Sequence, residues 1–497
     1  MADATAALAS AFDAISTDRA TLKNGAQVSL QPWLASLLSS PGAAEAIPCL
    51  NSVRPDAVAD GTLVRFTGMV QDVQDPEYYE GVYEEVLPGG TTPRLRTAKY
   101  RDVLTPTPGA EVRERSEFIW ARTPVVCVPP PSQTAWSAAA IGGSPREDEA
   151  PSPSRATGAP RSKRAADEEE PEREAAPAER AAPESPAAMS DVATAASKRA
   201  CPPVDACAPG GGGGGGGDGA WARASAGGVL LKVYDAESDE LKAHELKVHE
   251  LVEVYGVIER ASELLPGEDE GGNWPMCEEV AGERKLRPPP SAQPRLHVIS
   301  SRRLPELQAA LLPHDTAAEA EAIARSRAQL ETLRAAVLAG LASTLGGDAL
   351  AAEYVLLAVL SRVISRHGES PVGKLPLALT GCPPAAAGAA ASPVGAALHS
   401  ALSELLPLCA RQPITPDALN GASFVPMKDQ EANCIWPALL QLPAGASLLL
   451  DEAMMVPGKL SEVGVKNIGA LSILLSRQKV GYVSRSRLTY DLGEFYL

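Results

Sequence analysis

A low-complexity stretch in the middle of the chain constrains the fold more than any other feature of the sequence. Residues 138–227 are dominated by Ala, Pro, Ser, Glu and Arg, and they include an unbroken glycine run at residues 210–217. Chain of this composition buries too little apolar area to offset the conformational entropy that ordering costs. We therefore predict a disordered, acidic linker over residues 138–227, with folded parts on both sides of it.

One short basic cluster stands out in this predicted linker. The segment RSKR, residues 161–164, places Arg161, Lys163 and Arg164 close together in the chain. Clusters of Lys and Arg can act as nuclear-import signals. Solvated linker charge explains four residues equally well, so both interpretations stay open.

The part before the linker is predicted to be β-rich. Residues 1–45 form an Ala-rich segment with helical patches, and residues 46–137 carry strand patterns. In LVRFTGMVQDVQDPEYYEGVYEE, residues 63–85, alternating side chains predict a half-buried strand that the Asp75-Pro76 pair ends. We expect residues 79–86 to return as a second strand.

Two further blocks add strands to this part. FIWARTPVVCVPPP, residues 118–131, reads as a strand ended by prolines. After the linker, residues 228–304 continue the β-rich pattern, and we expect 229–234 to pair with 251–258, with one more strand at 295–300. Short strands with bulge-like glycines favour a small, OB-like barrel.

Beyond residue 305 the apolar period changes from two to 3.6 residues, which predicts an α/β domain over residues 305–497. Thr316 and Glu319 form a capping-box pattern, and Asp348 is positioned to cap a second helix. The apolar face of the first helix is predicted at Ile323, Leu330, Leu333, Val337 and Leu341. The second helix is predicted to carry Tyr354, Leu357 and Ile364 on one face.

Two strands are predicted in this last domain, and they raise the question of nucleotide hydrolysis. LPLALTG, residues 375–381, and SLLLDE, residues 447–452, flank an Ala-rich helix, and a final helix is expected at 465–477. In a nucleotide hydrolase, Asp451 and Glu452 would hold magnesium and orient water.

The matching phosphate loop is incomplete. It requires G-x-x-x-x-G-K-[ST] between a strand and a helix, with a Lys on the phosphates. Gly381 ends the apolar run and Gly388 follows at a later turn, but no Lys occurs in residues 375–427. Pro383 and Pro384 also lack the N–H groups of an anion nest. We expect a degenerate phosphate loop and neither catalysis, cofactor nor metal.

Charge and hydropathy limit the remaining function classes. The formal net charge of −17 makes the chain a poor stand-alone nucleic-acid binder, because affinity for phosphates comes largely from Lys and Arg. Single-strand DNA binding through an OB-like barrel stays as an alternative, with Phe66, Tyr78, Tyr79 or Tyr83 stacking on bases. No apolar run reaches the roughly 20 residues of a membrane helix, so we expect no membrane association.

Several blocks together resemble one family, the minichromosome maintenance complex-binding proteins. The blocks are LVRFTGMVQDVQDPEYYEGVYEE, YRDV, CVPPPSQTAW, LLKVYD, LVEVYGVIE, PRLHVI, GDALAAEYVLLAVLSRV, LPLALTGCP, LQLPAGASLLLDE and GVKNIGALSILLSRQKVGYV. Their order and spacing are those of the family. The resemblance covers both folded parts, about two thirds of the chain, and VQDVQDPEYYEGVYE is its most specific block.

The resemblance implies a nuclear, non-enzymatic factor that binds subunits of the replicative helicase. Such factors regulate helicase assembly and its unloading from chromatin, act in the cell cycle and cell division, and in plants serve sister-chromatid cohesion. Chromatin association would be indirect, and no small-molecule substrate is expected. The resemblance also implies an AAA+-like C-terminal domain with decayed nucleotide motifs. A divergent AAA+ NTPase is the alternative.

The resemblance departs from the family pattern at the end of the chain. Family members continue past QKVGYV with another strand and a tail, whereas this sequence ends at residues 487–497, RLTYDLGEFYL. We therefore expect a C-terminal domain that is either truncated by one core strand or folded differently at its end.

Overall fold

A computed structural model describes two large folded parts of the chain and several shorter pieces. The described residues are 28–142, 228–234, 245–260, 294–311, 316–485 and 490–496, apart from 41, 91, 105, 115, 116, 387 and 430–433, together with 8, 10–12, 15 and 22. Residues 143–227 of the predicted linker, and with them Arg161, Lys163 and Arg164, lie outside the described residues. The predicted linker boundary at residue 138 was wrong, because helix α5 (Ala135–Ala140) runs across it.

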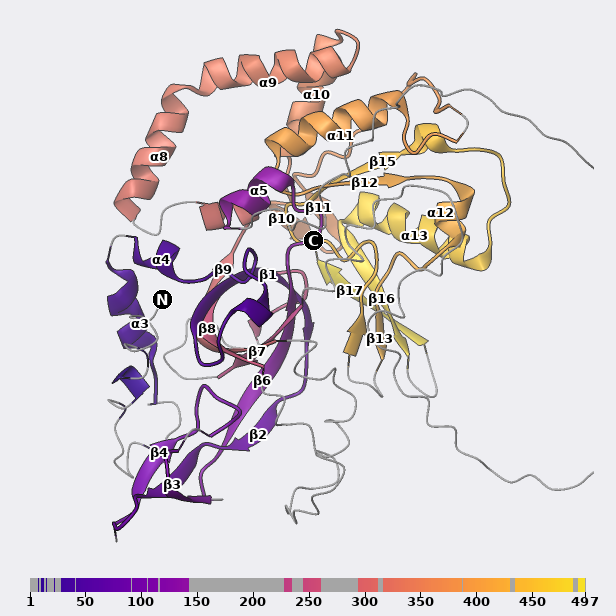
Figure 1. Ribbon diagram of the computed structural model, residues 1–497. Helices are drawn as coiled ribbons and strands as arrows, with labels where there is room; N and C mark the ends of the chain where they lie inside the picture. Colours follow the sequence, from indigo (N-terminus) through magenta and orange to yellow (C-terminus); the bar gives the residue numbers. More distant parts are fainter. Residues whose placement is uncertain are drawn as a thin grey trace, which may run out of the picture.

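Five strands from both sides of the predicted linker close into one barrel (Figure 1). They are β1 (Leu63–Val73), β6 (Ile119–Val128), β7 (Val229–Val233), β8 (Leu251–Glu259) and β9 (Arg295–Leu304). Strand β1 pairs antiparallel with both β6 and β8. Strand β9 lies between β8 and β7, and it pairs antiparallel with β8 and parallel with β7. An antiparallel β6–β7 pair completes the ring. The ranges 46–137 and 228–304 therefore form a single β domain.

Two predicted strand pairings were wrong. The return strand predicted at 79–86 is split into β2 (Glu77–Glu80) and β3 (Val82–Val86), and neither pairs with β1. Strand β2 extends the sheet at β6, while β3 forms a separate sheet with β4 (Arg94–Thr97) and β5 (Glu111–Glu114). Strands β7 and β8 are likewise not partners, since β9 lies between them. Neighbours in sequence were assumed to pair, but closure of the ring imposes other partners.

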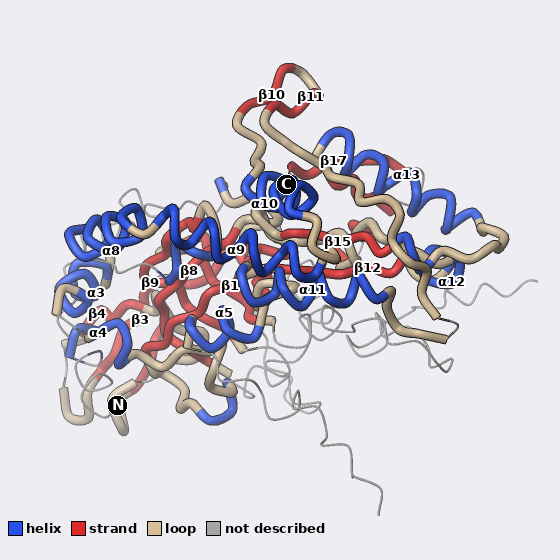
Figure 2. The backbone as a smooth tube through the Cα atoms, turned by 90° about the horizontal axis from the view of Figure 1, so that it is seen from above, coloured by secondary structure: helices blue, strands red, loops and turns tan. Residues whose placement is uncertain are grey.

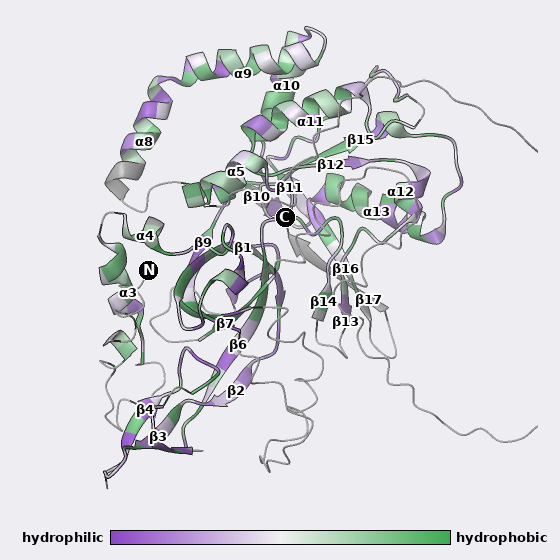
Figure 3. Ribbon diagram, in the orientation of Figure 1, coloured by the Kyte–Doolittle hydropathy of each residue, from purple (hydrophilic) through white to green (hydrophobic). Residues whose placement is uncertain are grey.

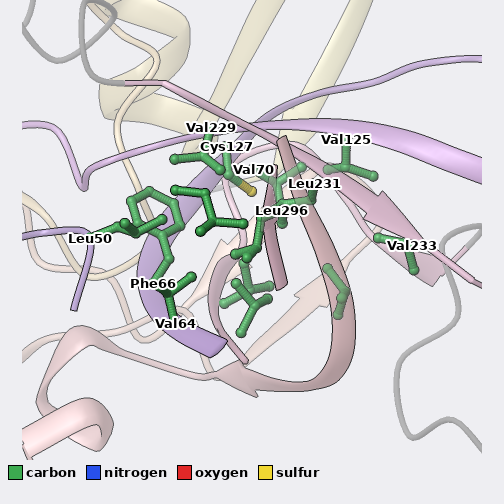
Figure 4. Packing of buried hydrophobic residues seen from close by; sticks show 14 of the residues in the cluster. Leu50, Val64, Phe66, Val70, Val125, Cys127, Val229, Leu231, Val233 and Leu296 are labelled. Atoms are coloured by element: carbon green, nitrogen blue, oxygen red, sulfur yellow. The ribbon is translucent and has the colours of Figure 1, made fainter. Parts of the chain in front are cut away.

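The barrel is filled by side chains from alternating positions of its strands. Val64, Phe66 and Val70 of β1 meet Val125 of β6 and Leu231 of β7 in one buried cluster (Figure 4). Because successive side chains of a strand point to opposite faces, this pattern sends the positions between them outward. Outside the barrel, helix α3 (Gln31–Leu38) buries Leu34 in a second cluster that includes residues of β8 and β9. The short elements α4 (Ala43–Ala46) and η2 (Pro55–Ala57) follow α3.

The C-terminal part is mixed α/β. Its helices are α8 (Thr316–Ala328), α9 (Leu330–Thr344), α10 (Ala349–Leu360), α11 (Pro393–Leu405), α12 (Pro416–Asn420) and α13 (Glu462–Arg477), with η7 (Leu307–Leu311) and η8 (Glu452–Met454). Its strands are β10 (Ser365–His367), β11 (Ser370–Val372), β12 (Cys409–Pro413), β13 (Met427–Asp429), β14 (Cys434–Trp436), β15 (Ser447–Asp451), β16 (Lys479–Arg485) and β17 (Tyr490–Tyr496). Helix α11 lies along the parallel β12–β15 pair (Figure 2).

The strand predicted at residues 375–381 was wrong. These residues form no strand, and the N–H of Leu375 donates to Ser361 Oγ, 3.1 Å away, instead of to a sheet neighbour. Leu379 still packs into the cluster that α10 and α11 share. The apolar run therefore contributes to the core without pairing in a sheet. Within the described residues, the parallel sheet at β12 and β15 therefore has two strands, fewer than an AAA+-like sheet implies.

The prediction of one continuous first helix in this part was also wrong, because the helix breaks at Gln329 into α8 and α9. Of its predicted apolar face, Leu341 is buried and Val337 half-buried, while Ile323, Leu330 and Leu333 are exposed. The predicted cap at Asp348 is confirmed, since its side chain accepts from the N–H of Ala351. No single described helix has the length and apolarity for a membrane span; only α9 and α10 together meet that test, across a bend of 116°.

A seam of buried contacts joins the barrel to the C-terminal part. The turn after β6 supplies one side: the N–H of Cys409 donates to Ser132 O at 2.9 Å, and Ser137 Oγ donates to Pro407 O at 2.8 Å. On the other side, the side-chain amide of Gln441 donates to Gln71 O at 3.0 Å. Around these bonds, apolar residues of both parts share one cluster, which includes Met69, Leu304, Leu307 and Leu408.

Two titratable side chains are buried in the seam. Asp72 accepts the N–H of Ile435 at 3.0 Å, and burial raises the pKa of this carboxyl to about 6. Lys428 lowers this pKa and Asp75 raises it, and both effects are weaker than that of burial. His249 Nδ1 lies 2.8 Å from Leu442 O, and burial lowers the pKa of this imidazole to about 4. The imidazole is therefore neutral near pH 7 and donates from Nδ1.

Asp72→Asn should stabilise the protein at neutral pH. The folded-state pKa of Asp72 exceeds its ordinary value of 3.8, so the ionised form weakens the fold as pH rises from about 4 to about 6. The asparagine keeps an acceptor for Ile435 and removes the buried charge. We expect a gain of up to about 3 kcal/mol above pH 7 and none near pH 4, measured by chemical denaturation across this range.

The exposed residue Asp60 provides the control. Asp60→Asn removes the same charge where solvent already covers it. A pH-independent gain for Asp72→Asn, or an equal gain for Asp60→Asn, would contradict the assignment.

Candidate functional site

Asp451 and Glu452, the two acidic residues that suggested an ATPase, lie in different environments. Asp451, the last residue of β15, is buried, while Glu452 is exposed at the start of η8. Asp451 Oδ2 accepts the N–H of Ser392 at 3.0 Å and pairs with Arg411 Nη1 at 3.3 Å. Asp451 therefore already has a cation and an N–H donor as partners within the chain, and these contacts fix the end of β15 against the start of α11.

The carboxylate of Asp451 lies at the N-terminus of α11, where a helix favours an anion. Ser392 caps this helix through its Oγ, which accepts the N–H of Gly395 at 3.0 Å. A Cβ added to Gly395 would lie 2.7 Å from both Asp451 Cγ and Ser392 Oγ. Sequence reasoning missed Arg411 and Gly395; the one available signal was a glycine in the first turn of an Ala-rich helix.

The two glycines of the degenerate phosphate loop form exposed turns. Gly381 and Gly388 have φ of 75° and 77°, and no atom lies within 4 Å of a Cβ built on either. The loop meets the end of β15 through the N–H of Ala385, which donates to Ala453 O at 3.2 Å. The structure thus brings Ser392, rather than either glycine, to Asp451.

A second cluster of ionisable residues lies on the outside of the barrel. Oxygen and nitrogen atoms of Asp102, Glu259 and His297 lie within 4.8 Å of one another, as in a metal site. However, Asp102 is paired with Arg122 and with Arg295, and a further acid, Glu77, is paired with Arg122 and Lys232. Three carboxylates meet three cations here, so the residues fit a closed ion-pair network better than a divalent metal.

The aromatic residues considered for base stacking are mostly committed to packing. Phe66 fills the barrel and Tyr83 is buried in the neighbouring sheet. Tyr79 packs edge-on against Trp120 and Tyr234, with centroid distances of 6.2 and 5.8 Å. Tyr78, in contrast, is 73% exposed on β2. One exposed ring does not form a stacking platform.

Exposed apolar side chains gather on helix α10, which Figure 3 draws as mainly hydrophobic. Leu350, Tyr354 and Leu357 are 67%, 47% and 50% exposed, and their spacing places them on one face. We call these three residues the α10 stripe. The opposite face buries Ala352 and Val355, so the helix is apolar on both sides. Such a helix is normally buried all round, so the exposed stripe is a candidate binding surface.

Arg411→Gln should lower the free energy of unfolding by about 3 kcal/mol, because it leaves the buried carboxylate of Asp451 without its cation. Arg334→Gln is the matched control, since it breaks an ion pair with Glu353 whose side chains are both 46% exposed. The control should change stability by less than about 1 kcal/mol. Chemical denaturation measures both, and equal losses would show that Asp451 does not depend on Arg411.

Comparison with known proteins agrees with the resemblance of the sequence blocks. The sequence profile of the family described as Mini-chromosome maintenance replisome factor matches residues 34–484. The Mini-chromosome maintenance complex-binding protein of Gallus gallus is 30% identical over 459 residues, which cover 88% of this chain and 68% of that protein. Proteins of the same name from Salmo salar and Arabidopsis thaliana are 32% and 30% identical, with 68% and 69% of their lengths covered. The match covers 88% of this chain for the Salmo salar protein and 89% for the Arabidopsis thaliana protein. The chain therefore belongs to the mini-chromosome maintenance replisome factor family.

Proposed function

We propose that this protein is a non-enzymatic factor that binds the mini-chromosome maintenance complex. The observation that carries the proposal is the family match across residues 34–484, together with the name that the relatives share. Which helicase subunits it contacts is a matter for experiment. In the cell, the proposal places the protein in the nucleus, where it regulates assembly of the helicase and its unloading from chromatin. Sister-chromatid cohesion is part of the same proposal.

The absence of nucleotide hydrolysis is supported by chemistry at the end of β15. Asp451 already has Arg411 and the N–H of Ser392 as partners, and Glu452 faces solvent. The chain also has no Lys in residues 375–427 to neutralise a phosphate. In this proposal the C-terminal part derives from an AAA+-like domain whose nucleotide site has been replaced by structural contacts.

The barrel is proposed to be of the OB type. Its support is the closed ring of five strands in which β1 pairs with β6 and β8 and the parallel pair is β7 with β9. The contacts of the seam hold this barrel beside the C-terminal part. In this arrangement the barrel serves as a scaffold.

The α10 stripe is the surface that we propose for the helicase subunit. Its three side chains are exposed, and two further apolar residues follow α10 in the chain: Ile364 and Val372, which are joined by a bond from the N–H of Ile364 to Val372 O at 2.9 Å. Both of these residues are exposed as well. Protein interfaces have apolar, aromatic centres with few charges, which matches this composition.

Replacing Tyr354 and Leu357 together by Glu should weaken binding of purified mini-chromosome maintenance complex by at least about tenfold, because two charges would have to be desolvated at the contact. The thermal midpoint should stay close to that of the unmodified protein, since both side chains are already half exposed. Binding is measured with immobilised full chain after nuclease treatment.

Ser343→Glu on α9 is the control, because it adds one of these two charges at an exposed polar position of the neighbouring helix. Unchanged affinity of the Tyr354/Leu357 variant would place the contact elsewhere. Failure of the unmodified chain to bind any subunit of the complex would overturn the proposed function itself.

A further inference from the structure

The outer face of β6, β7 and β9 carries cationic and aromatic side chains, some of which contact the acidic residues Glu77 and Glu259. Arg122 lies on β6, Lys232 on β7, and Arg295 and His297 on β9, at positions that alternate with the barrel core. Tyr234 follows β7 and stacks on the His297 ring with a centroid distance of 6.1 Å. Guanidinium groups beside aromatic rings are the chemistry that binds single-stranded nucleic acid, and barrels of the OB type use this face.

The chain covers this face with one of its own loops. Residues 98–104, which we call the strap, form no helix or strand. The Asp102 carboxylate reaches between two guanidinium groups: Oδ1 pairs with Arg122 Nη2, and Oδ2 with Arg295 Nη1 at 2.7 Å. The N–H of Val103 donates to Glu259 Oε1 at 3.2 Å. A single acidic side chain thus occupies the position that a phosphate would take between two arginines.

The strap has an unusual backbone conformation. Tyr100 has φ of 66°, in the left-handed region that a bulky residue rarely adopts. Its ring packs edge-on against Tyr234 at a centroid distance of 5.0 Å, and its N–H donates to Tyr234 Oη at 3.2 Å. Strained residues persist where surrounding contacts hold them, and they cluster at ligand clamps and switches. These contacts, together with the burial of Tyr100, fix the position of the strap.

We propose that the strap is an internal ligand that closes a binding face for single-stranded nucleic acid. When the strap is displaced, a backbone phosphate takes the place of the Asp102 carboxylate between Arg122 and Arg295. Tyr234, which packs edge-on against Tyr100 of the strap, then becomes available for stacking on bases, a contact that an acidic peptide would not use. The bound strap keeps this factor off nucleic acid. The inference is independent of helicase binding, because it concerns the purified chain alone.

The test compares binding of a fluorescent oligothymidylate of about 20 nucleotides to the full chain and its variants by anisotropy. Asp102→Ala removes the internal anion, and Asp102→Asn weakens it while keeping its shape. Both variants should bind at least about tenfold more tightly than the unmodified chain, with affinity that falls steeply as salt rises. Asp60→Ala is the control, because it removes the same charge from an exposed pair with Arg260.

Whether the oligonucleotide binds at this face of the barrel is tested by combining Asp102→Ala with Arg295→Gln. The second substitution should abolish the gain in affinity. The proposal is overturned if folded Asp102 variants show no gain, if Asp60→Ala gains equally, or if the gain survives Arg295→Gln. Preferential binding of polyglutamate over the oligonucleotide would also overturn it. So would failure of both Asp102 variants to fold, since a displaceable strap cannot be required for folding.

Discussion

A buried carboxylate must be matched by a cation or by N–H donors, and this requirement organises both folded parts of the chain. Asp102 is matched by Arg122 and Arg295 on the barrel, and Asp451 by Arg411 and the N–H of Ser392. Removing either partner of a buried pair is costly, whereas the intact pair contributes little net stability. These ion pairs are therefore better understood as fixing where loops and helix ends lie than as sources of stability.

The same requirement bears on the acidic strand end that resembles a nucleotide hydrolase. In a nucleotide hydrolase the acid at the end of a strand stays open to magnesium and water. Here Asp451 is closed off by a guanidinium, and the close approach of Gly395 leaves no room for a side chain beside it. The anion position at the start of α11 is filled from within the chain.

The sequence blocks that carry the family resemblance also hold the molecule together. The VQDVQD block provides Gln71 and Asp72 for contacts with Gln441 and Ile435. The CVPPPSQTAW block provides Ser132 and Thr134 for contacts with Cys409 and Pro407. Both blocks therefore act at the seam. This role could not be predicted from the sequence, because each contact joins residues more than 260 positions apart, whose pairing depends on the whole fold.

Local features were predictable where local physics decides them. The extent of β1 and the cap at Asp348 follow from neighbouring residues, and the structure confirms both. The half-buried character predicted for β1 was wrong, because apolar clusters cover both of its faces and nearly all of its residues are buried. The pairing of β1 with β6 and β8 was missed because strand patterns do not specify partners. Residues 375–381 were misassigned because an apolar run has the same composition whether it pairs in a sheet or packs against helices. Arg411 was missed because an isolated arginine carries no signal of its partner.

The central claim is that this chain acts by binding other proteins and that its acidic strand end is structural. The most direct test is equilibrium binding of ATP with magnesium to the purified full chain, followed by measurement of phosphate release. The account predicts no saturable binding and no hydrolysis, because Asp451 is paired with Arg411 and no Lys is present at the loop. Saturable ATP binding that Asp451→Asn abolishes would contradict it.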